Sequence, residues 1–202
     1  MILHDLDPDD NVTSRAGVMV TNSTADTVTR YILNNFIYNI KRTAVTAEPR
    51  DCVAVGQTST GTSVDTGADL YNNTIRGVST TDGTAYGYEF SPSTTAINNI
   101  AISCGDACFK VSDDSSGSTT SSHNLSDDNT AGDLGSTENQ LTAQTSDTGV
   151  VTLYTLVSST NLHLRYVAGY PISLGVDRGT RLNAPDGILV DIDGDARAYG
   201  IP

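Results

Sequence analysis

Short apolar runs alternate with polar turns along the first 130 residues, and the same pattern of elements recurs. Apolar runs occupy positions 17–20, 52–55, 86–90 and 107–111. Strands that open on a pair of asparagines are interspersed among these runs, beginning at Asn34-Asn35, Asn72-Asn73 and Asn98-Asn99, with a fainter copy at His123-Asn124. A repeated strand, turn and Asn-Asn strand at unequal intervals predicts a solenoid whose loops vary in length.

The paired asparagines have a physical use at the corner of a stacked coil. Asn adopts the left-handed backbone conformation at low cost, and its amide bonds nearby backbone groups. In a stack, Asn35, Asn73 and Asn99 can also bond one another from coil to coil, which satisfies buried polar groups. Ile37 and Ile75 then fall on one strand face and form an apolar column. The alternative interpretation is ordinary turn chemistry between unrelated strands.

The composition favours an all-β chain. Thr, Ser, Asn, Asp and Gly dominate, Trp does not occur, and 17% of the residues are charged. No long segment has apolar residues at helical spacing, whereas short β-branched runs recur between Gly, Ser, Asp and Asn clusters. We expect one continuous domain, with β-helix coils over 1–130 and a terminal coil and C-terminal β cap over 131–202.

Several local predictions follow from the same pattern. Residues 1–16 are acidic and turn-rich, and residues 30–41 form a long strand pair. The polar segments 56–69, 79–84 and 112–122 form exposed loops suited to lateral contacts. Residues 112–129 are either a linker or a last irregular coil. The expected core residues of the strand pair are Tyr31, Ile32, Leu33, Phe36 and Ile37.

The charge balance excludes some partners. Eleven Lys and Arg residues stand against twenty-four Asp and Glu residues, a formal net charge of −13. Nucleic acid and anionic membranes require a basic face, so neither is an expected partner. The apolar stretch 150–157 is too short and too hydroxylated to insert into a bilayer. Residues 1–7 do not read as a secretory signal, which leaves export without one, a fragment, or release by lysis.

The cysteines Cys52, Cys104 and Cys108 cannot all pair with one another. Cys104 and Cys108 are close enough in sequence for a disulfide if the residues between them turn. We expect buried thiols instead, because small thiols pack well in strands. No His lies near them in the sequence, which argues against a metal site there.

The C-terminal third resembles a known family. The chain contains four segments in the order His123-Asn124-Leu125-Ser126-Asp127-Asp128-Asn129-Thr130-Ala131, Leu162-His163-Leu164-Arg165, Pro171-Ile172-Ser173-Leu174-Gly175-Val176-Asp177 and Asp191-Ile192-Asp193-Gly194-Asp195-Ala196-Arg197. This order resembles the C-terminal portion of right-handed parallel β-helix proteins of the pectin-lyase-like type. Such domains occur in secreted bacterial and phage-associated proteins. The resemblance implies a right-handed parallel β-helix with a C-terminal cap, but its members include enzymes, adhesins and virion parts. The short Ile-Gly-Ala-acidic ending usual in that family does not occur here.

Three residues come nearest to a catalytic set. Asp113, Asp114 and His123 suggest the paired carboxylates and nearby His with which polygalacturonase-type β-helix hydrolases act on glycosidic bonds. The Asn-Thr-Asp and Arg-x-Lys elements of that family do not occur in this sequence, so a turn explains the Asp pair more simply. For a pectate-lyase-like reaction, neither Arg76 nor Lys110 has an acidic companion two residues away.

A metal candidate lies near the C-terminus. Asp191, Asp193 and Asp195 flank a glycine and can supply oxygen ligands to calcium. The alternative is an Asp-Gly turn whose carboxylates bond backbone N–H groups and Arg197. We expect no required cofactor.

The sequence thus predicts a non-catalytic structural or adhesive protein on a virion surface or outside a cell. A phage virion component, such as a decoration, fibre or tail-associated protein, fits best. Its partners would be other proteins of the same particle, further copies of itself, or a glycan. The alternative is a polysaccharide-acting β-helix enzyme, either a lyase or a glycoside hydrolase.

Overall fold

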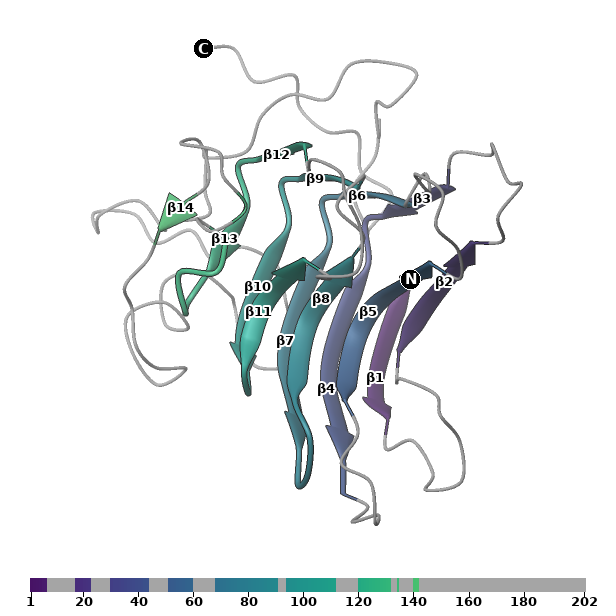
Figure 1. Cartoon of the computed structure of the whole chain (residues 1–202), viewed down its shortest axis with the longest axis vertical. Coiled ribbons are helices and arrows are strands. Elements are labelled where there is room, and N and C mark those ends of the chain that lie inside the picture. Colours follow the sequence, from purple (N-terminus) through teal and green to yellow (C-terminus); the bar gives the residue numbers. More distant parts are fainter. Residues whose placement is uncertain are drawn as a thin grey trace.

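The computed structural model describes residues 1–6, 17–22, 30–43, 51–59, 68–90, 94–111, 120–131, 134 and 140–141. Nearly all of these residues lie in β-strands or in the tight corners between strands (Figure 1). Every strand pair among them is parallel. The all-β prediction is confirmed for the described residues. Among them, no helix is long and apolar enough to cross a membrane.

The strands form three parallel sheets that the chain visits in turn (Figure 1). The first sheet contains, in order, β1 (Ile2–Leu6), β4 (Phe36–Arg42), β7 (Thr74–Thr80), β10 (Ile100–Cys104), β13 (Leu125–Ser126) and β14 (Gln140–Leu141). The second contains β2 (Val18–Asn22), β5 (Cys52–Ser59), β8 (Ala85–Phe90) and β11 (Ala107–Val111). The third contains β3 (Arg30–Leu33), β6 (Ala68–Tyr71), β9 (Thr95–Ile97) and β12 (Thr120–Ser122).

The sequence pattern maps directly onto this arrangement. The predicted apolar runs at 17–20, 52–55, 86–90 and 107–111 overlap the four strands of the second sheet. The predicted Asn-led strands become β4, β7, β10 and β13 of the first sheet. The repeated unit of the sequence is therefore one passage of the chain through the sheets.

Buried asparagines form a column where the third sheet passes into the first. Asn35 donates to Oδ1 of Asn73 through Nδ2 at 2.8 Å and through its backbone N–H at 3.1 Å. Asn73 donates to Oδ1 of Asn99 in the same way, at 3.0 and 3.1 Å. Asn99 donates to Oδ1 of Asn124, at 3.1 and 2.9 Å. The predicted stacking of Asn35, Asn73 and Asn99 is confirmed, and Asn124 extends it.

The same amides also tie this column to the third sheet. Nδ2 of Asn73 donates to the carbonyl of Ile32 at 2.8 Å, and Nδ2 of Asn99 donates to that of Leu70 at 2.9 Å. Asn124 repeats the contact with the carbonyl of Ala96, at 2.7 Å. Asn73, Asn99 and Asn124 are fully buried. An unsatisfied amide there would cost about 1–3 kcal/mol. The hydrogen bonds within the column and to the third sheet avoid this cost.

The residue before each column asparagine makes the corner. Asn34, Asn72, Asn98 and His123 have φ values of 53°, 54°, 59° and 55°. This left-handed conformation is accessible to Asn and disfavoured for most other residues with a Cβ. The first Asn of each pair therefore turns the chain, and the second joins the buried column.

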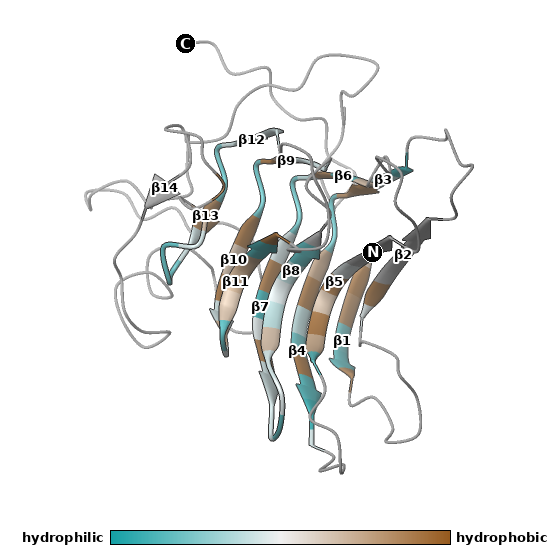
Figure 2. Ribbon diagram, viewed as in Figure 1, coloured by the Kyte–Doolittle hydropathy of each residue, from teal (hydrophilic) through white to brown (hydrophobic). Residues whose placement is uncertain are grey.

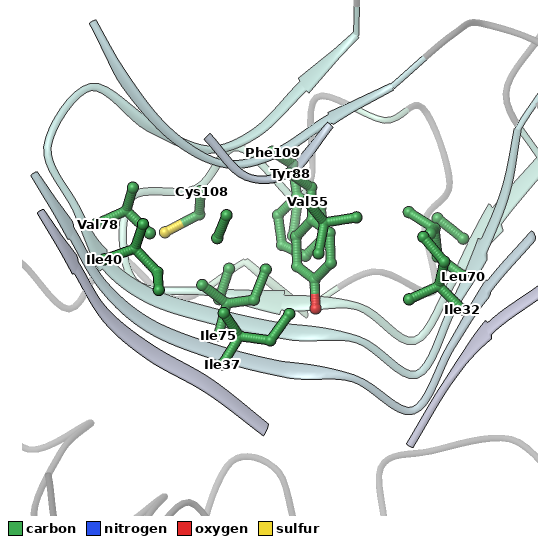
Figure 3. Close-up of a cluster of buried hydrophobic side chains, with 14 of the residues drawn as sticks. Ile32, Ile37, Ile40, Val55, Leu70, Ile75, Val78, Tyr88, Cys108 and Phe109 are labelled. Carbon is green, nitrogen blue, oxygen red and sulfur yellow. The ribbon is translucent and has the colours of Figure 1, made fainter. Parts of the chain in front are cut away.

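The core lies between the sheets and is built from stacked columns of like residues. Ile37 and Ile75 are in register and fully buried, which confirms the predicted apolar column (Figure 3). From the second sheet, Tyr88 and Phe109 point inward with their rings stacked at 4.9 Å between centroids (Figure 3). Hydrophobic and polar segments alternate along the strands (Figure 2), as expected where one face is buried.

A second left-handed column crosses the first sheet within its strands. Asp5, Asn39, Gly77 and Ser103 have φ values of 53°, 57°, 71° and 58°. Each falls at a gap between paired neighbours, and the register is the same on both sides of the gap, so no residue is inserted and the four residues face one another from strand to strand. Sequence analysis did not predict this column, because its members share no residue type.

Some local predictions are wrong. Residues 2–6 form strand β1, although the segment was expected to be turn-rich. Tyr31 and Leu33 are exposed, and Phe36 is half-buried, whereas Ile32 and Ile37 are buried as predicted. The expected loops 56–69 and 79–84 begin inside strands, because β5 ends at Ser59 and β7 at Thr80. Side chains alternate between the two faces of a strand, so Tyr31 and Leu33 point away from the buried Ile32.

Other predictions fall outside the described residues. These are residues 60–67 of the expected loop 56–69, the polar segment 112–119, and almost all of the C-terminal cap, including the apolar stretch 150–157. The division at residue 130 is therefore not tested.

We expect Asn73→Leu to lower the free energy of unfolding by about 1–3 kcal/mol, because Asn35 and Asn99 lose their partners. Chemical denaturation measures the difference. Ser79→Leu, at an exposed position of the same strand, is the control and should change it by no more than about 0.5 kcal/mol. Equal effects of the two substitutions would contradict the role of the column.

The corner conformation predicts a difference between two substitutions at Asn72. Both Asn72→Ala and Asn72→Gly remove its side-chain bond with Asn98, so that loss cancels in the comparison. Only Ala has a Cβ that opposes the left-handed backbone. We expect the Ala variant to be less stable than the Gly variant by about 1–2 kcal/mol in thermal unfolding. The reverse order would rule out this account.

Candidate functional site

His123 is the one predicted site residue within the described part of the chain. Its φ of 55° places it at a corner, directly before Asn124 of the buried column. Asp113 and Asp114 lie outside the described residues, as do the calcium candidates Asp191, Asp193 and Asp195. His123 thus has a structural role at the corner, and a catalytic pairing with Asp113 and Asp114 stays a prediction.

The outer face of the first sheet carries two further columns of side chains. Register places Ile2, Phe36, Thr74, Ile100 and Leu125 in one column, and His4, Tyr38, Arg76 and Ile102 in the other. Ile102 and Leu125 are 0% and 2% exposed, whereas Ile2 is 59% exposed. This face is therefore covered over β10 and β13 and open over β1.

Aromatic rings stack across the open part of this face. The rings of His4 and Tyr38 lie 4.8 Å apart and within 4° of parallel. His4 Nδ1 also lies 2.7 Å from a carboxylate oxygen of Asp5. Hydrogen bonds from Asn39 and His4 lower the pKa of Asp5. An exposed ring beside a carboxylate can both stack on a partner and bond to it.

The exposed large hydrophobic side chains of the described residues all lie on β1 and β3 or directly before β1. Met1 and Ile2 are each 59% exposed, Tyr31 is 48% exposed and Leu33 is 36% exposed. β1, β2 and β3 are also the terminal strands of the three sheets. With His4, these four residues define the N-terminal end surface. Concentrated apolar exposure beside strand edges is typical of an association site.

Polar side chains bond the terminal strand at the opposite end of the second sheet. Asp128 Oδ2 accepts from the backbone N–H of Cys108 at 2.7 Å, and Thr130 Oγ1 accepts from that of Phe109 at 3.0 Å. Both donors belong to β11, the last strand of that sheet. Side chains thus occupy backbone donors that a further strand would otherwise use.

A thiol and two carboxylates meet at this second location. One ligand atom from each of Cys108, Asp127 and Asp128 lies within 4.8 Å of the others. The Cys108 thiol donates to Asp127 Oδ1 at 3.2 Å. A hydrogen bond with the Cys104 thiol, together with burial, raises the pKa of Cys108. Burial also raises the pKa of Asp127. Among the described residues this is the group whose chemistry suits a metal ion.

Sequence reasoning missed both locations for identifiable reasons. Strand β1 was missed because its partly buried Leu3 and Leu6 are three positions apart, not two, and acidic residues surround them. Cys108 and Asp127 are 19 positions apart, so no local motif joins them. Only the repeat length, applied from one copy of the repeated unit to the next, could have indicated that Cys108 and Asp127 lie close together.

The raised pKa of Asp127 predicts how stability depends on pH in the metal-free protein. Its folded-state pKa lies above the ordinary value of 3.8, so the folded chain retains this proton at a pH where the unfolded chain has lost it. The resulting stability is present below 3.8 and is lost as pH rises through the raised value. With chelator present, the parent should lose stability over this range relative to Asp127→Asn. A pH-independent difference in their unfolding free energies would contradict this prediction.

The function of this chain is proposed from its own geometry. No protein family, curated protein or solved structure matches it.

Proposed function

We propose that the chain is a right-handed parallel β-helix in which each coil contributes one strand to each of three sheets. The strand order supports this, because β4, β5 and β6 each lie beside β1, β2 and β3 in their sheets, and later strands continue the pattern. Crossovers between parallel strands of one sheet are nearly always right-handed. In this proposal residues 131–202 complete the last coil and the cap.

The register of the final strand pair supports a continuing coil. Gln140 pairs with Leu125 between β14 and β13. In the sequence, Asn139 directly precedes Gln140, just as Asn124 directly precedes Leu125. The Asn signature therefore recurs at the expected position in the chain.

The function that fits this architecture best is a non-catalytic structural or adhesive role on the surface of a virion or outside a cell. The observation that carries it is the gathering of exposed hydrophobic side chains on the N-terminal end surface. Backbone groups and core side chains are occupied in stacking the coils, so association falls to the surface and the ends. A decoration, fibre or tail-associated protein of a phage is our first choice.

The partners follow from the same surface. Apolar side chains such as Ile2 and Leu33 suit another protein of the particle or a second copy. The His4 and Tyr38 rings also offer a stacking surface for a glycan. The net charge of −13 disfavours nucleic acid.

A polysaccharide-acting enzyme is the alternative function. The observation in its favour is Arg76, a cationic side chain on the outer face of the first sheet, in register with Tyr38. A lyase reaction needs such a base near clustered carboxylates. Asp113 and Asp114 are the acidic candidates for a hydrolase.

We expect the protein to self-associate reversibly through its N-terminal end surface. The double substitution Ile2→Glu and Leu33→Glu should weaken association by tenfold or more, because each buried aliphatic side chain contributes about 1.5–3 kcal/mol. Sedimentation equilibrium measures the dissociation constant. Thr81→Glu adds a charge at an exposed turn away from this surface and should leave it unchanged.

Assays of reducing-sugar release from acidic polysaccharides separate the two functions. The structural role predicts no release by the parent protein. Release that disappears in the Asp113→Asn and Asp114→Asn double variant would overturn that role in favour of the enzyme. Equal association of the parent and the Ile2→Glu and Leu33→Glu variant would remove the N-terminal end surface from the proposal.

A further inference from the structure

Two turns meet beside the end of the second sheet. One links β10 to β11 and is flanked by Cys104 and Cys108, and the other follows β13 and contains Asp127 and Asp128. The ligand atoms of Cys108, Asp127 and Asp128 approach within 4.8 Å of one another. Segments well separated in the sequence thus bring thiol and carboxylate groups to one place.

The contact between Cys108 and Asp127 has the dimensions of a shared cation site. Sγ and Oδ1 are 3.2 Å apart, with the thiol proton between them. In a tetrahedral zinc site, bond lengths of about 2.3 Å to sulfur and about 2.1 Å to oxygen put the two ligand atoms about 3.6 Å apart. A zinc ion can therefore replace the proton after a shift of a few tenths of an ångström.

Hydrogen bonds from backbone N–H groups hold both carboxylates in place. Asp127 Oδ2 accepts from the backbone N–H of Ser103 at 3.0 Å. Asp128 Oδ1 accepts from the backbone N–H of Thr130 at 3.0 Å and Oδ2 accepts from that of Cys108 at 2.7 Å. Asp128 Oδ1 also accepts from the Thr130 hydroxyl at 2.6 Å. A carboxylate oxygen has two lone-pair directions, so Asp127 Oδ2 and Asp128 Oδ2, which each accept one bond, retain capacity for a metal. Such supporting bonds orient ligands in known metal sites.

A glycine on the neighbouring strand leaves room for this arrangement. A Cβ added to Gly87 would lie 2.6 Å from the Cys108 carbonyl oxygen and 2.9 Å from Cys104 Sγ. The position of Cys108 beside the carboxylates therefore depends on the missing side chain.

We propose that Cys108, Asp127 and Asp128 bind a soft divalent cation, zinc, that fastens the turn after β13 to the start of β11. Thiolate ligands favour zinc over calcium, which takes oxygen ligands. On binding, the Cys108 thiol releases its proton to solvent and its sulfur forms a bond to the metal. Affinity therefore rises with pH. The site is independent of the proposed surface function.

The experiment titrates the reduced, metal-free chain with zinc in a calorimeter, and separately with cadmium while recording the ultraviolet absorbance of thiolate-to-metal charge transfer. We expect one ion per chain, a higher Tm with zinc, and a cadmium band. Cys108→Ser and Asp127→Asn should each weaken zinc binding tenfold or more. Cys52→Ser, which removes a buried thiol two strands away from β11 in the second sheet, should retain the band and the affinity.

Several results would overturn the proposal. These are no cadmium band in the folded parent chain, unchanged zinc affinity in Asp127→Asn, or loss of binding only when Asp191, Asp193 and Asp195 become Asn. If Cys108→Ser does not fold, Asp128→Asn decides, because Asp128 is exposed and lies outside the core. Unchanged zinc affinity in Asp128→Asn would then contradict the proposal.

Discussion

The arrangement of the strands depends on one constraint, which is that the buried amides of the asparagine column must all be hydrogen-bonded. Each one must be bonded on both sides, because an unsatisfied amide in the core costs more than most single contacts contribute. Asn73 meets this requirement through Asn35 before it, Asn99 after it and the carbonyl of Ile32. These contacts hold β4, β7 and β10 at the register in which Ile37 and Ile75 pair in the apolar core.

The two ends of the described stack present different chemistry. At the N-terminal end, Met1 stands where the column would continue, since Phe36 bonds its carbonyl as Thr74 bonds that of Asn35. Met1 thus takes the place of a column asparagine, and its thioether cannot donate a hydrogen bond as an amide does. At the other end of the second sheet, Asp128 and Thr130 bond the backbone of β11. We propose association at the first end, whereas side chains occupy backbone donors at the second.

Sequence reasoning succeeded where a residue type reports directly on backbone geometry. The Asn pairs predicted the corners and the column, and Ile37 and Ile75 followed from the period of two. It failed to find the second left-handed column, because residues of different types, such as Asp5, Gly77 and Ser103, adopt that backbone conformation. It also failed where proximity depends on the coil repeat, as between Cys108 and Asp127. Exposure of Tyr31 and Leu33 depends on which strand is terminal, and local composition carries no information on that.

The corner asparagines also govern how this chain can change in length. Successive members of the column are separated by 38, 26 and 25 positions, yet each meets the next with nearly identical hydrogen bonds. The alignment is restored at every corner, so the additional residues between Asn35 and Asn73 do not displace the strands that follow. Loops on the flanks can therefore diverge freely in evolution, and segments inserted at these positions would be displayed at a defined height along the stack.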